Sequence, residues 1–217
     1  MKDSQPLSRP RHRRAGISLV LALALAALSA TPASAGAADA AAPSMQVEGQ
    51  AIPLSASVGG NPLVLNGAGV RAWTVYKMYV AALYLPHKAN NAVDIVGQPG
   101  AKRVQLRILL NVSGASGYLA DAFTGGIRKR VTPQQFDAMK DRVDAFDKTV
   151  RSLETKKGDV VDLDFLPDAG LVLSMNGHAV GKAIPGADLY GAMLKIWVGD
   201  DAKDKDLRAA MLGGASS

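Results

Sequence analysis

One arginine, Arg71, stands in a stretch of the chain that is otherwise dominated by apolar and aromatic residues. A guanidinium group presents five N–H donors in a planar fork, which fits a carboxylate or a phenolate oxygen. If Arg71 faces the protein interior it requires an anionic or polar partner, because an unpaired buried charge is costly. The alternative is that its stem follows the apolar surface and its charge reaches water. Arg71 is therefore the candidate for anion binding, with both placements open.

The segment from Gly67 to Ala72 reads Gly-Ala-Gly-Val-Arg-Ala and matches the loose nucleotide pattern G-x-G-x-x-A. That motif requires a helix N-terminus directly after the loop to bind the pyrophosphate. The residues that follow, Trp73 to Tyr76, favour a strand. We therefore expect no dinucleotide binding here.

The spacing of the acidic and histidine residues predicts neither a metal site nor a catalytic triad. Asp162 and Asp164 alternate with apolar residues in a predicted strand, and we expect them to form a solvated face rather than a metal site. Beyond the first 35 residues only His87 and His178 remain, one after a proline and one after a predicted turn. No Ser-His-Asp set is predicted from them.

The composition excludes several functional classes. The 217 residues contain no Cys, which excludes disulfides, thiolate metal sites and cysteine nucleophiles. Aromatic residues make up 5%, too few for a broad base-stacking platform. We expect no cofactor and no metal. The length and the 48% of apolar residues predict one domain with a substantial core.

The N-terminus has the layout of a secretory signal peptide. Residues 1–14 carry five basic residues and one acidic residue, an apolar run follows over 15–30, and Ala33-Ser34-Ala35 comes next. We predict cleavage after Ala35. An uncleaved anchor is the alternative, although the run is short for a span of about 20 residues. Arg13-Arg14 matches a twin-arginine signal only weakly, so the export route stays open.

Most of the net charge belongs to this segment. The whole chain carries 25 basic and 19 acidic residues, a charge of +6. Without residues 1–35 it has 20 basic and 18 acidic residues, or +2. We therefore expect no nucleic-acid partner, membrane contact only during export, and a periplasmic or secreted protein. Residues 36–45 form a predicted flexible spacer, 46–212 the domain, and 213–217 a tail.

Periodicity and turn signals predict an α+β order. Strands are expected over 52–58, 62–65 and 70–85, with a loop at 66–69, and then over 102–112, 160–165 and in a hairpin over 171–184 around Asn176-Gly177. Helices are expected over 90–96, 113–130, 132–153, 189–198 and 204–212. Gly125-Gly126 inside a helix suggests that something approaches closely there. The order favours one antiparallel sheet with helices packed on one face.

The segments Leu65-Asn66-Gly67-Ala68-Gly69-Val70-Arg71 and Tyr79-Val80-Ala81-Ala82-Leu83-Tyr84-Leu85 resemble the chalcone isomerase family, most closely its bacterial exported chalcone isomerase-like proteins. The resemblance runs over about 46–212. It implies an open-faced β-sandwich in which a large antiparallel sheet is covered on one face by helices, with an apolar cleft between them.

The resemblance also implies site residues. In plant members that cyclise chalcones, an Arg matching Arg71 attracts the substrate phenolate, and a Tyr matching Tyr118 helps polarise the ketone. Other members bind fatty acids with the same two groups. The sequence departs from the enzyme at Tyr79 and Ile196, which stand where the enzyme has Thr, and at Gly125, which stands where it has Asn. Arg107 is the nearest candidate for the enzyme's Lys.

Three hypotheses follow. The first is a non-catalytic protein that binds a fatty acid or similar amphipathic anion through Arg71 and Tyr118, with Tyr79, Gly125, Ile196 and Trp197 lining the cleft. The second is an isomerase of the chalcone-to-flavanone type, an intramolecular lyase that uses Arg71 and Tyr118. The third is a structural or partner-binding protein whose cleft is filled by its own side chains. The oligomeric state is left undetermined.

Overall fold

The computed structural model describes residues 42–111 and 114–214; the predicted signal peptide and its cleavage position lie outside them. A seven-stranded antiparallel sheet has the order β3-β4-β5-β6-β7-β8-β9. Its strands are β3 (Ser55–Val58), β4 (Asn61–Trp73), β5 (Tyr76–Leu85), β6 (Lys102–Ile108), β7 (Val160–Leu166), β8 (Gly170–Met175) and β9 (His178–Ala179). A separate hairpin of β1 (Ser44–Val47) and β2 (Gln50–Pro53) precedes it, so the first strand begins two residues before the predicted boundary at 46.

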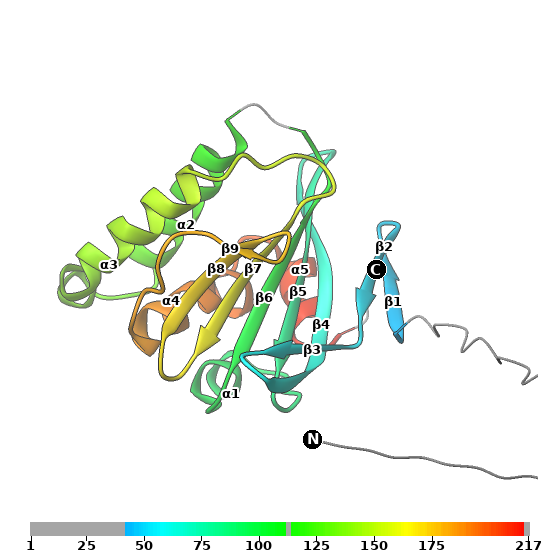
Figure 1. Ribbon diagram of the computed structural model, residues 1–217, viewed down its shortest axis with the longest axis horizontal. Helices are drawn as coiled ribbons and strands as arrows, with labels where there is room; N and C mark the ends of the chain where they lie inside the picture. The colour runs from blue at the N-terminus through cyan, green and yellow to red at the C-terminus, as the bar shows by residue number, and fades with distance from the viewer. Residues whose placement is uncertain (1–41, 112–113, 215–217) are drawn as a thin grey trace, which may run out of the picture. The chain divides into compact units, whose positions relative to one another are not determined.

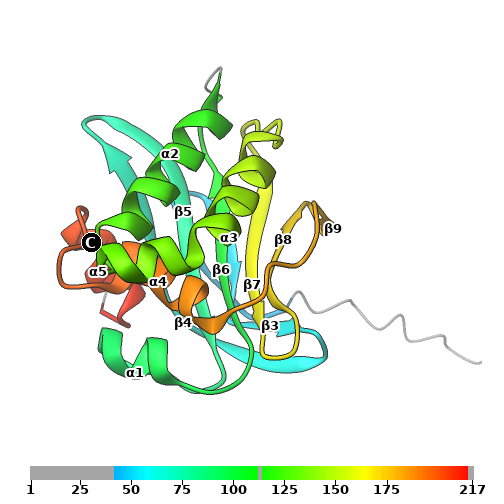
Figure 2. The ribbon, with the colours of Figure 1, turned by 90° about the vertical axis from the view of Figure 1, so that its left-hand side faces the viewer.

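Helices cover one face of the sheet, as Figures 1 and 2 show, which confirms the predicted α+β class. They are α1 (Ala92–Gly97), α2 (Ala115–Arg128), α3 (Pro133–Arg151), α4 (Ala187–Val198) and α5 (Lys205–Met211). The apolar stripe of α3 is buried, and its first turn is fixed by a capping box between Thr132 and Gln135. The main core lies between the helices and side chains such as Leu83, Val104 and Leu163 of the sheet.

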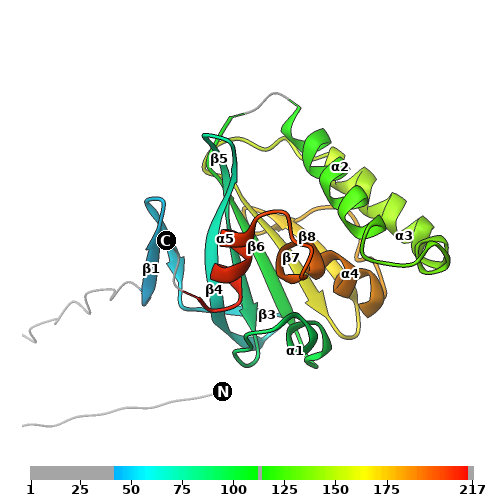
Figure 3. The same cartoon turned by 180° about the vertical axis from the view of Figure 1, so that it is seen from behind.

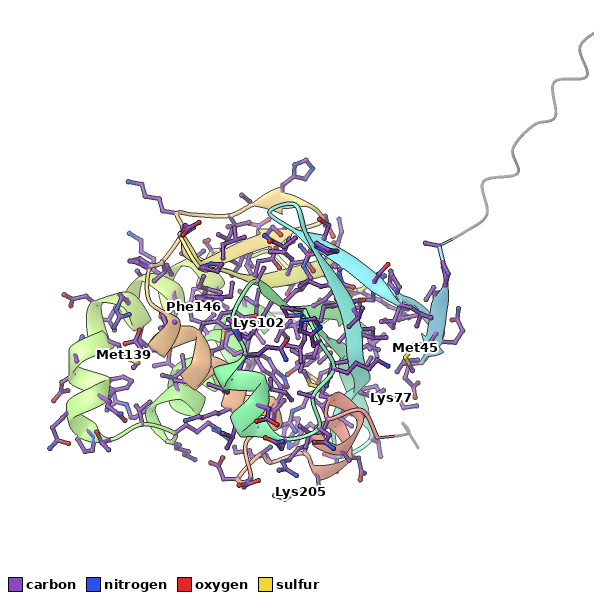
Figure 4. The ribbon with its side chains drawn as sticks, turned by 90° about the horizontal axis from the view of Figure 1, so that it is seen from below. Met45, Lys77, Lys102, Met139, Phe146 and Lys205 are labelled. Carbon is purple, nitrogen blue, oxygen red and sulfur yellow. The ribbon has the colours of Figure 1, made fainter. Side chains whose placement is uncertain are left out.

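A second, smaller core lies on the opposite face of the sheet. Val47 and Ile52 of the β1–β2 hairpin pack there with Val58, Val80 and Tyr84. Figure 4 shows the two sides: Met139 and Phe146 belong to α3 and the main core, while Met45 lies on β1 across the sheet. The hairpin and the helix layer are also seen on opposite sides of the sheet in Figure 3.

The predicted solvation of Asp162 and Asp164 is wrong. Both carboxylates are buried on the face that carries the smaller core. Arg103 donates two hydrogen bonds of 2.6 Å to Asp164, and Gln105 donates one of 2.8 Å to Asp162. Alternation placed the two aspartates on one face correctly, but it cannot show that the neighbouring strand β6 supplies a guanidinium and an amide on the same face.

The predicted loop at 66–69 is also wrong, as is the uninterrupted strand over 70–85. Residues 66–69 lie within β4, where the register with β5 shifts between Leu65 and Gly67. The chain reverses instead at Thr74-Val75, between β4 and β5. Glycine and asparagine favour a turn at 66–69, and β-branched residues favour a strand at Thr74-Val75. Tertiary packing instead gives a strand at the first place and a turn at the second.

Within the described ranges, no helix combines the length and the apolar character that crossing a membrane requires.

Candidate functional site

A cavity of about 670 Å³ lies between the sheet and the helices. Side chains of β4, β5 and β6 form one wall, and those of α2, α4 and α5 form the other. Its lining is mainly apolar and aromatic and includes Met78, Ile108, Leu119, Phe123, Trp197 and Leu207. This size falls within the roughly 300–1,000 Å³ typical of small-molecule sites. The cleft is therefore present and is not filled by the protein's own side chains.

Arg71 lies in the wall of this cavity, and its anionic partner comes from the C-terminal part of the chain. Its Nη1 donates a hydrogen bond of 3.3 Å to Oδ2 of Asp204, which also accepts from the backbone N–H of Ala72 at 3.4 Å. The other oxygen of Asp204 caps α5 by accepting from the N–H of Leu207 at 3.0 Å. The side chain of Arg71 is 30% exposed, so it is neither sealed in the core nor free in water.

Tyr79 is the cross-strand partner of Arg71, so the two side chains lie next to each other on the helix-facing side of the sheet. The Tyr79 hydroxyl accepts a hydrogen bond of 3.2 Å from Nε1 of Trp197 on α4. Burial raises the pKa of Tyr79, although the Trp197 hydrogen bond and the charge of Arg71 act in the opposite direction. The phenol is thus protonated at neutral pH, and its O–H has no acceptor among the residues that the structure describes.

The Asn66-Gly67-Ala68-Gly69 segment fastens α5 onto β4. Asn66 donates to the carbonyls of Ala89 and Met211, at 2.9 and 2.7 Å, and accepts from the N–H of Ala89 at 2.8 Å. A Cβ at Gly67 would lie 2.0 Å from the carbonyl oxygen of Ala210, so only glycine allows α5 to lie this close. The motif that resembles a nucleotide fingerprint therefore positions α5, and with it the carboxylate of Asp204.

The two glycines of α2 have different roles. A Cβ at Gly126 would lie 2.8 Å from Cδ1 of Ile196, so this glycine lets α2 and α4 approach closely. A Cβ at Gly125 would meet no atom of the described residues within 4 Å, and Gly125 lines the cavity. The predicted close approach thus occurs at Gly126, while Gly125 leaves open space beside the cavity.

All six residues predicted for the site, Arg71, Tyr79, Tyr118, Gly125, Ile196 and Trp197, line the same cavity. Tyr118 stands in the first turn of α2 and is 71% exposed, whereas Tyr79 adjoins Arg71. Arg107 points to the other face of β6, where its Nε donates to Gln105 at 3.0 Å, and it does not line the cavity.

Sequence reasoning missed Asp204, Trp73 and Tyr76. Asp204 is recognisable as a residue that can cap the last helix, but it is 133 positions from Arg71, and no local pattern joins the two. The β-branched and aromatic residues around Trp73 and Tyr76 predict a continuous strand. Trp73 and Tyr76 lie instead at the end of the β4–β5 hairpin and line the cavity.

Replacing Tyr79 by phenylalanine is expected to lower the free energy of unfolding by about 1–2 kcal/mol, because the buried indole N–H of Trp197 would lose its acceptor. Urea unfolding measures the effect. Tyr76→Phe is the control, since Tyr76 is exposed, and it should unfold at the wild-type concentration. A Tyr79→Phe variant as stable as wild type would contradict this account of the Trp197 hydrogen bond.

Comparison with known proteins identifies the family that has this fold. The sequence model of a family described as chalcone isomerase-like matches residues 44–213. Among solved structures, a fatty-acid binding protein of Arabidopsis thaliana is similar, with a TM-score of 0.59 and 18% identity over 76% of this chain and 92% of that one. At this identity the likeness shows a shared fold. A search of curated protein sequences finds no significant match. Since the family match covers well over half of the chain, the protein belongs to the chalcone isomerase-like family.

Proposed function

We propose that the protein binds a fatty acid, or a similar amphipathic carboxylate, in the cavity between the sheet and the helices. The observation that carries the proposal is an apolar cavity of about 670 Å³ with a partly exposed guanidinium, Arg71, in its wall. An apolar pocket with few converging polar groups suits a ligand with one charged end and a long apolar part. The solved structure of similar fold is described as a fatty-acid binding protein, which supports the ligand class.

Arg71 and Tyr79 supply the polar end of the proposed site. One hydrogen bond joins Arg71 to Asp204 within the described residues, which leaves other guanidinium N–H groups for a ligand carboxylate. The protonated hydroxyl of Tyr79 lies beside Arg71 and can donate to the same carboxylate. In this arrangement Asp204 and the ligand carboxylate both contact the guanidinium of Arg71. The negative charge of Asp204 lowers the affinity for the ligand but does not prevent binding.

Isomerase activity does not form part of the proposal. Gly125 and Ile196 stand where the resemblance implies polar side chains in the enzyme, and neither can form a side-chain hydrogen bond. Arg107, the nearest candidate for the enzyme's Lys, lies on the other face of β6. A flavanone assay serves as the check: we expect chalcone to cyclise no faster with the protein than without it.

We also propose that the chain is exported and that residues 1–35 are removed, from the basic, apolar and small-residue layout of the N-terminus. N-terminal sequencing of the protein recovered outside the cytoplasm is expected to start at Gly36. A protein that begins at Met1 and stays in the membrane fraction would support the anchor instead.

The direct test of the ligand is binding itself. Native mass spectrometry of the freshly purified protein is expected to show a fatty-acid adduct that disappears on delipidation. The delipidated protein is then expected to take up palmitate stoichiometrically in calorimetry. A delipidated, folded protein that binds no fatty acid of any chain length would refute the proposal.

Gly125→Leu is expected to weaken fatty-acid binding about tenfold, because the new side chain enters open space beside the cavity and competes with the ligand's apolar part. The helix itself should gain stability, since glycine is a poor helix former. Gly117→Leu is the matched control, on the same helix and outside the cavity lining. Equal palmitate affinities of the two variants in calorimetry would argue against the cavity as the binding site.

A further inference from the structure

Several large apolar side chains are exposed around the cavity. Trp73, Val75 and Tyr76 at the β4–β5 hairpin are 71%, 82% and 56% exposed, and Tyr118 on α2 is also exposed. We call these four residues the mouth rim. Trp73, Tyr76 and Tyr118 also line the cavity, so the apolar surface is continuous from the outside of the protein to its interior. Figures 1 and 2 show the hairpin and the start of α2 at the same end of the molecule.

Folding alone does not explain the apolar hairpin tip. Thr74 has a φ of 55°, in the left-handed region that a β-branched residue adopts only at a cost. The β8–β9 hairpin of the same chain reverses with Asn176-Gly177 at φ of 52° and 80°, the residue types suited to such turns. At the β4–β5 turn the chain carries Thr-Val instead, which is less suited to the backbone and adds exposed apolar surface.

Basic residues lie beside the mouth rim. Lys156 and Lys157 are exposed in the loop between α3 and β7. Of the two acidic residues in this loop, Glu154 is exposed, whereas Asp159 is buried and accepts a hydrogen bond of 2.8 Å from the N–H of Lys156. The loop is held at this end of the sheet, because the N–H of Lys157 donates to Oδ1 of Asn111 at 2.6 Å and the N–H of Gly158 to the carbonyl of Ile108 at 2.9 Å. Thr155 of this loop lines the cavity together with Ile108.

From these features we propose that the mouth rim docks on the surface of an anionic lipid bilayer, so that the protein contacts membranes after export and not only during it. Trp and Tyr favour the boundary between lipid headgroups and acyl chains, and nearby lysines are attracted to anionic headgroups. Docking in this way turns the opening of the cavity toward the acyl region. A fatty acid then passes between bilayer and cavity without crossing water. This last step rests on the proposed function; docking itself rests on the mouth rim and the lysines.

The chain provides its own reporter for docking. Its two tryptophans are Trp73, which is exposed, and Trp197, which is buried in the cavity wall. In full-length protein carrying Trp197→Phe, Trp73 is the sole tryptophan, and excitation at a wavelength that tyrosine does not absorb isolates its emission. Vesicles of phosphatidylcholine and phosphatidylglycerol are expected to shift its emission to the blue, and brominated lipid is expected to quench it. High salt and vesicles without phosphatidylglycerol should weaken both effects.

Val75→Asp is the decisive variant, because Val75 does not line the cavity and burying a charge at the hairpin tip opposes insertion. It is expected to lower vesicle binding at least about tenfold. Val93→Asp is the matched control: Val93 is 81% exposed, but on α1 at the far end of the fold, as Figure 1 shows. Residues 1–41 contain no tryptophan and are identical in all variants, so a difference between Val75→Asp and Val93→Asp does not come from them.

Either of two vesicle results would overturn docking. One is a Trp73 emission that vesicles do not change, and the other is equal vesicle binding of the two aspartate variants. If sedimentation shows that the hairpin tip instead joins two copies, with Val75→Asp giving monomers and no lipid quenching, docking is also refuted.

Palmitate titration without vesicles separates the two proposals. Val75→Asp is expected to bind palmitate like the wild type. Intact palmitate binding without vesicle binding refutes docking alone. Trp73 insertion without palmitate binding supports docking and refutes the carboxylate site.

Discussion

Arg71→Gln is expected to weaken the binding of a fatty acid about 30-fold. The same change should hardly alter the protein's affinity for the corresponding fatty alcohol. A hydrogen bond to a charged group contributes about 1.5–3 kcal/mol, which corresponds to roughly 10–150-fold in affinity. Glutamine keeps a polar side chain but not the charge. The alcohol has the same apolar part as the acid and no carboxylate, so it reports packing in the cavity alone. Calorimetry with the two ligands measures the difference directly.

Asp204→Asn is expected to change affinity in the opposite direction. The Asp204 carboxylate lies 3.3 Å from Nη1 of Arg71, the group that would also bind the ligand carboxylate. Removing the negative charge of Asp204 therefore removes a competitor for that guanidinium. Asparagine also caps helices well, so the hydrogen bond from Leu207 that starts α5 can persist. We expect fatty-acid binding about fivefold tighter, from about 1 kcal/mol of repulsion between partly solvated like charges.

The double variant Arg71→Gln/Asp204→Asn separates two roles for the arginine. If Arg71 binds the ligand carboxylate directly, the double variant should remain much weaker than Asp204→Asn alone. If Arg71 merely neutralises Asp204, the double variant should bind the acid as well as the wild type does. Equal loss of acid and alcohol binding in Arg71→Gln would show that the change disturbs the cavity rather than a charge contact.

Gly67→Ala is expected to cost about 3 kcal/mol of folding stability, a large effect for one methyl group. The added Cβ would lie 2.0 Å from the carbonyl oxygen of Ala210, which is backbone and cannot move without displacing α5. At 2–4 °C per kcal/mol for a domain of this size, the melting temperature should fall by about 9 °C. Calorimetry and urea unfolding test both values.

Gly69 provides a graded comparison. A Cβ there would lie 2.8 Å from the side-chain Cβ of Ala210 and 3.2 Å from Cδ1 of Leu207, so the second change Ala210→Gly removes the closer of these two contacts. We expect Ala210→Gly to restore Gly69→Ala partly and to leave Gly67→Ala unchanged. Gly117→Ala in α2 should be neutral or stabilising, because among residues 42–111 and 114–214 its new Cβ would meet only Nη1 of Arg151, at 3.7 Å. If Gly67→Ala unfolds like Gly117→Ala, the close docking of α5 on β4 is wrong.

Much of the fold was predictable because its signals are local. The stripe from Phe136 to Val150 and the cap at Thr132 define α3 within one stretch of chain, and Asn176-Gly177 defines a hairpin by its own backbone preference. Alternation in β6 and β7 assigned each side chain to a face of the sheet. Such patterns depend on neighbours a few residues away, and the sequence displays them completely.

The errors occurred where distant parts of the chain compete with local preference. Asn66 and Gly67 favour a turn by themselves, but hydrogen bonds to Ala89 and Met211 and the approach of Ala210 hold them in a bulged strand. Asp162 and Asp164 favour water, but Arg103 compensates their burial. In both cases the stabilising partner is far away in the sequence, and no window of sequence contains it.

By itself, the sequence determined the order of the elements, the family resemblance and the presence of one cation, Arg71, in an apolar setting. It left open whether that cation faces a partner or water. The tertiary structure decided this by placing Asp204 against Arg71 and Tyr79 beside it, at the wall of a cavity that no single segment encloses. The physical reason is that a guanidinium's state depends on which charges and how much solvent surround it. Those are set by packing between segments that the chain brings together only when it folds.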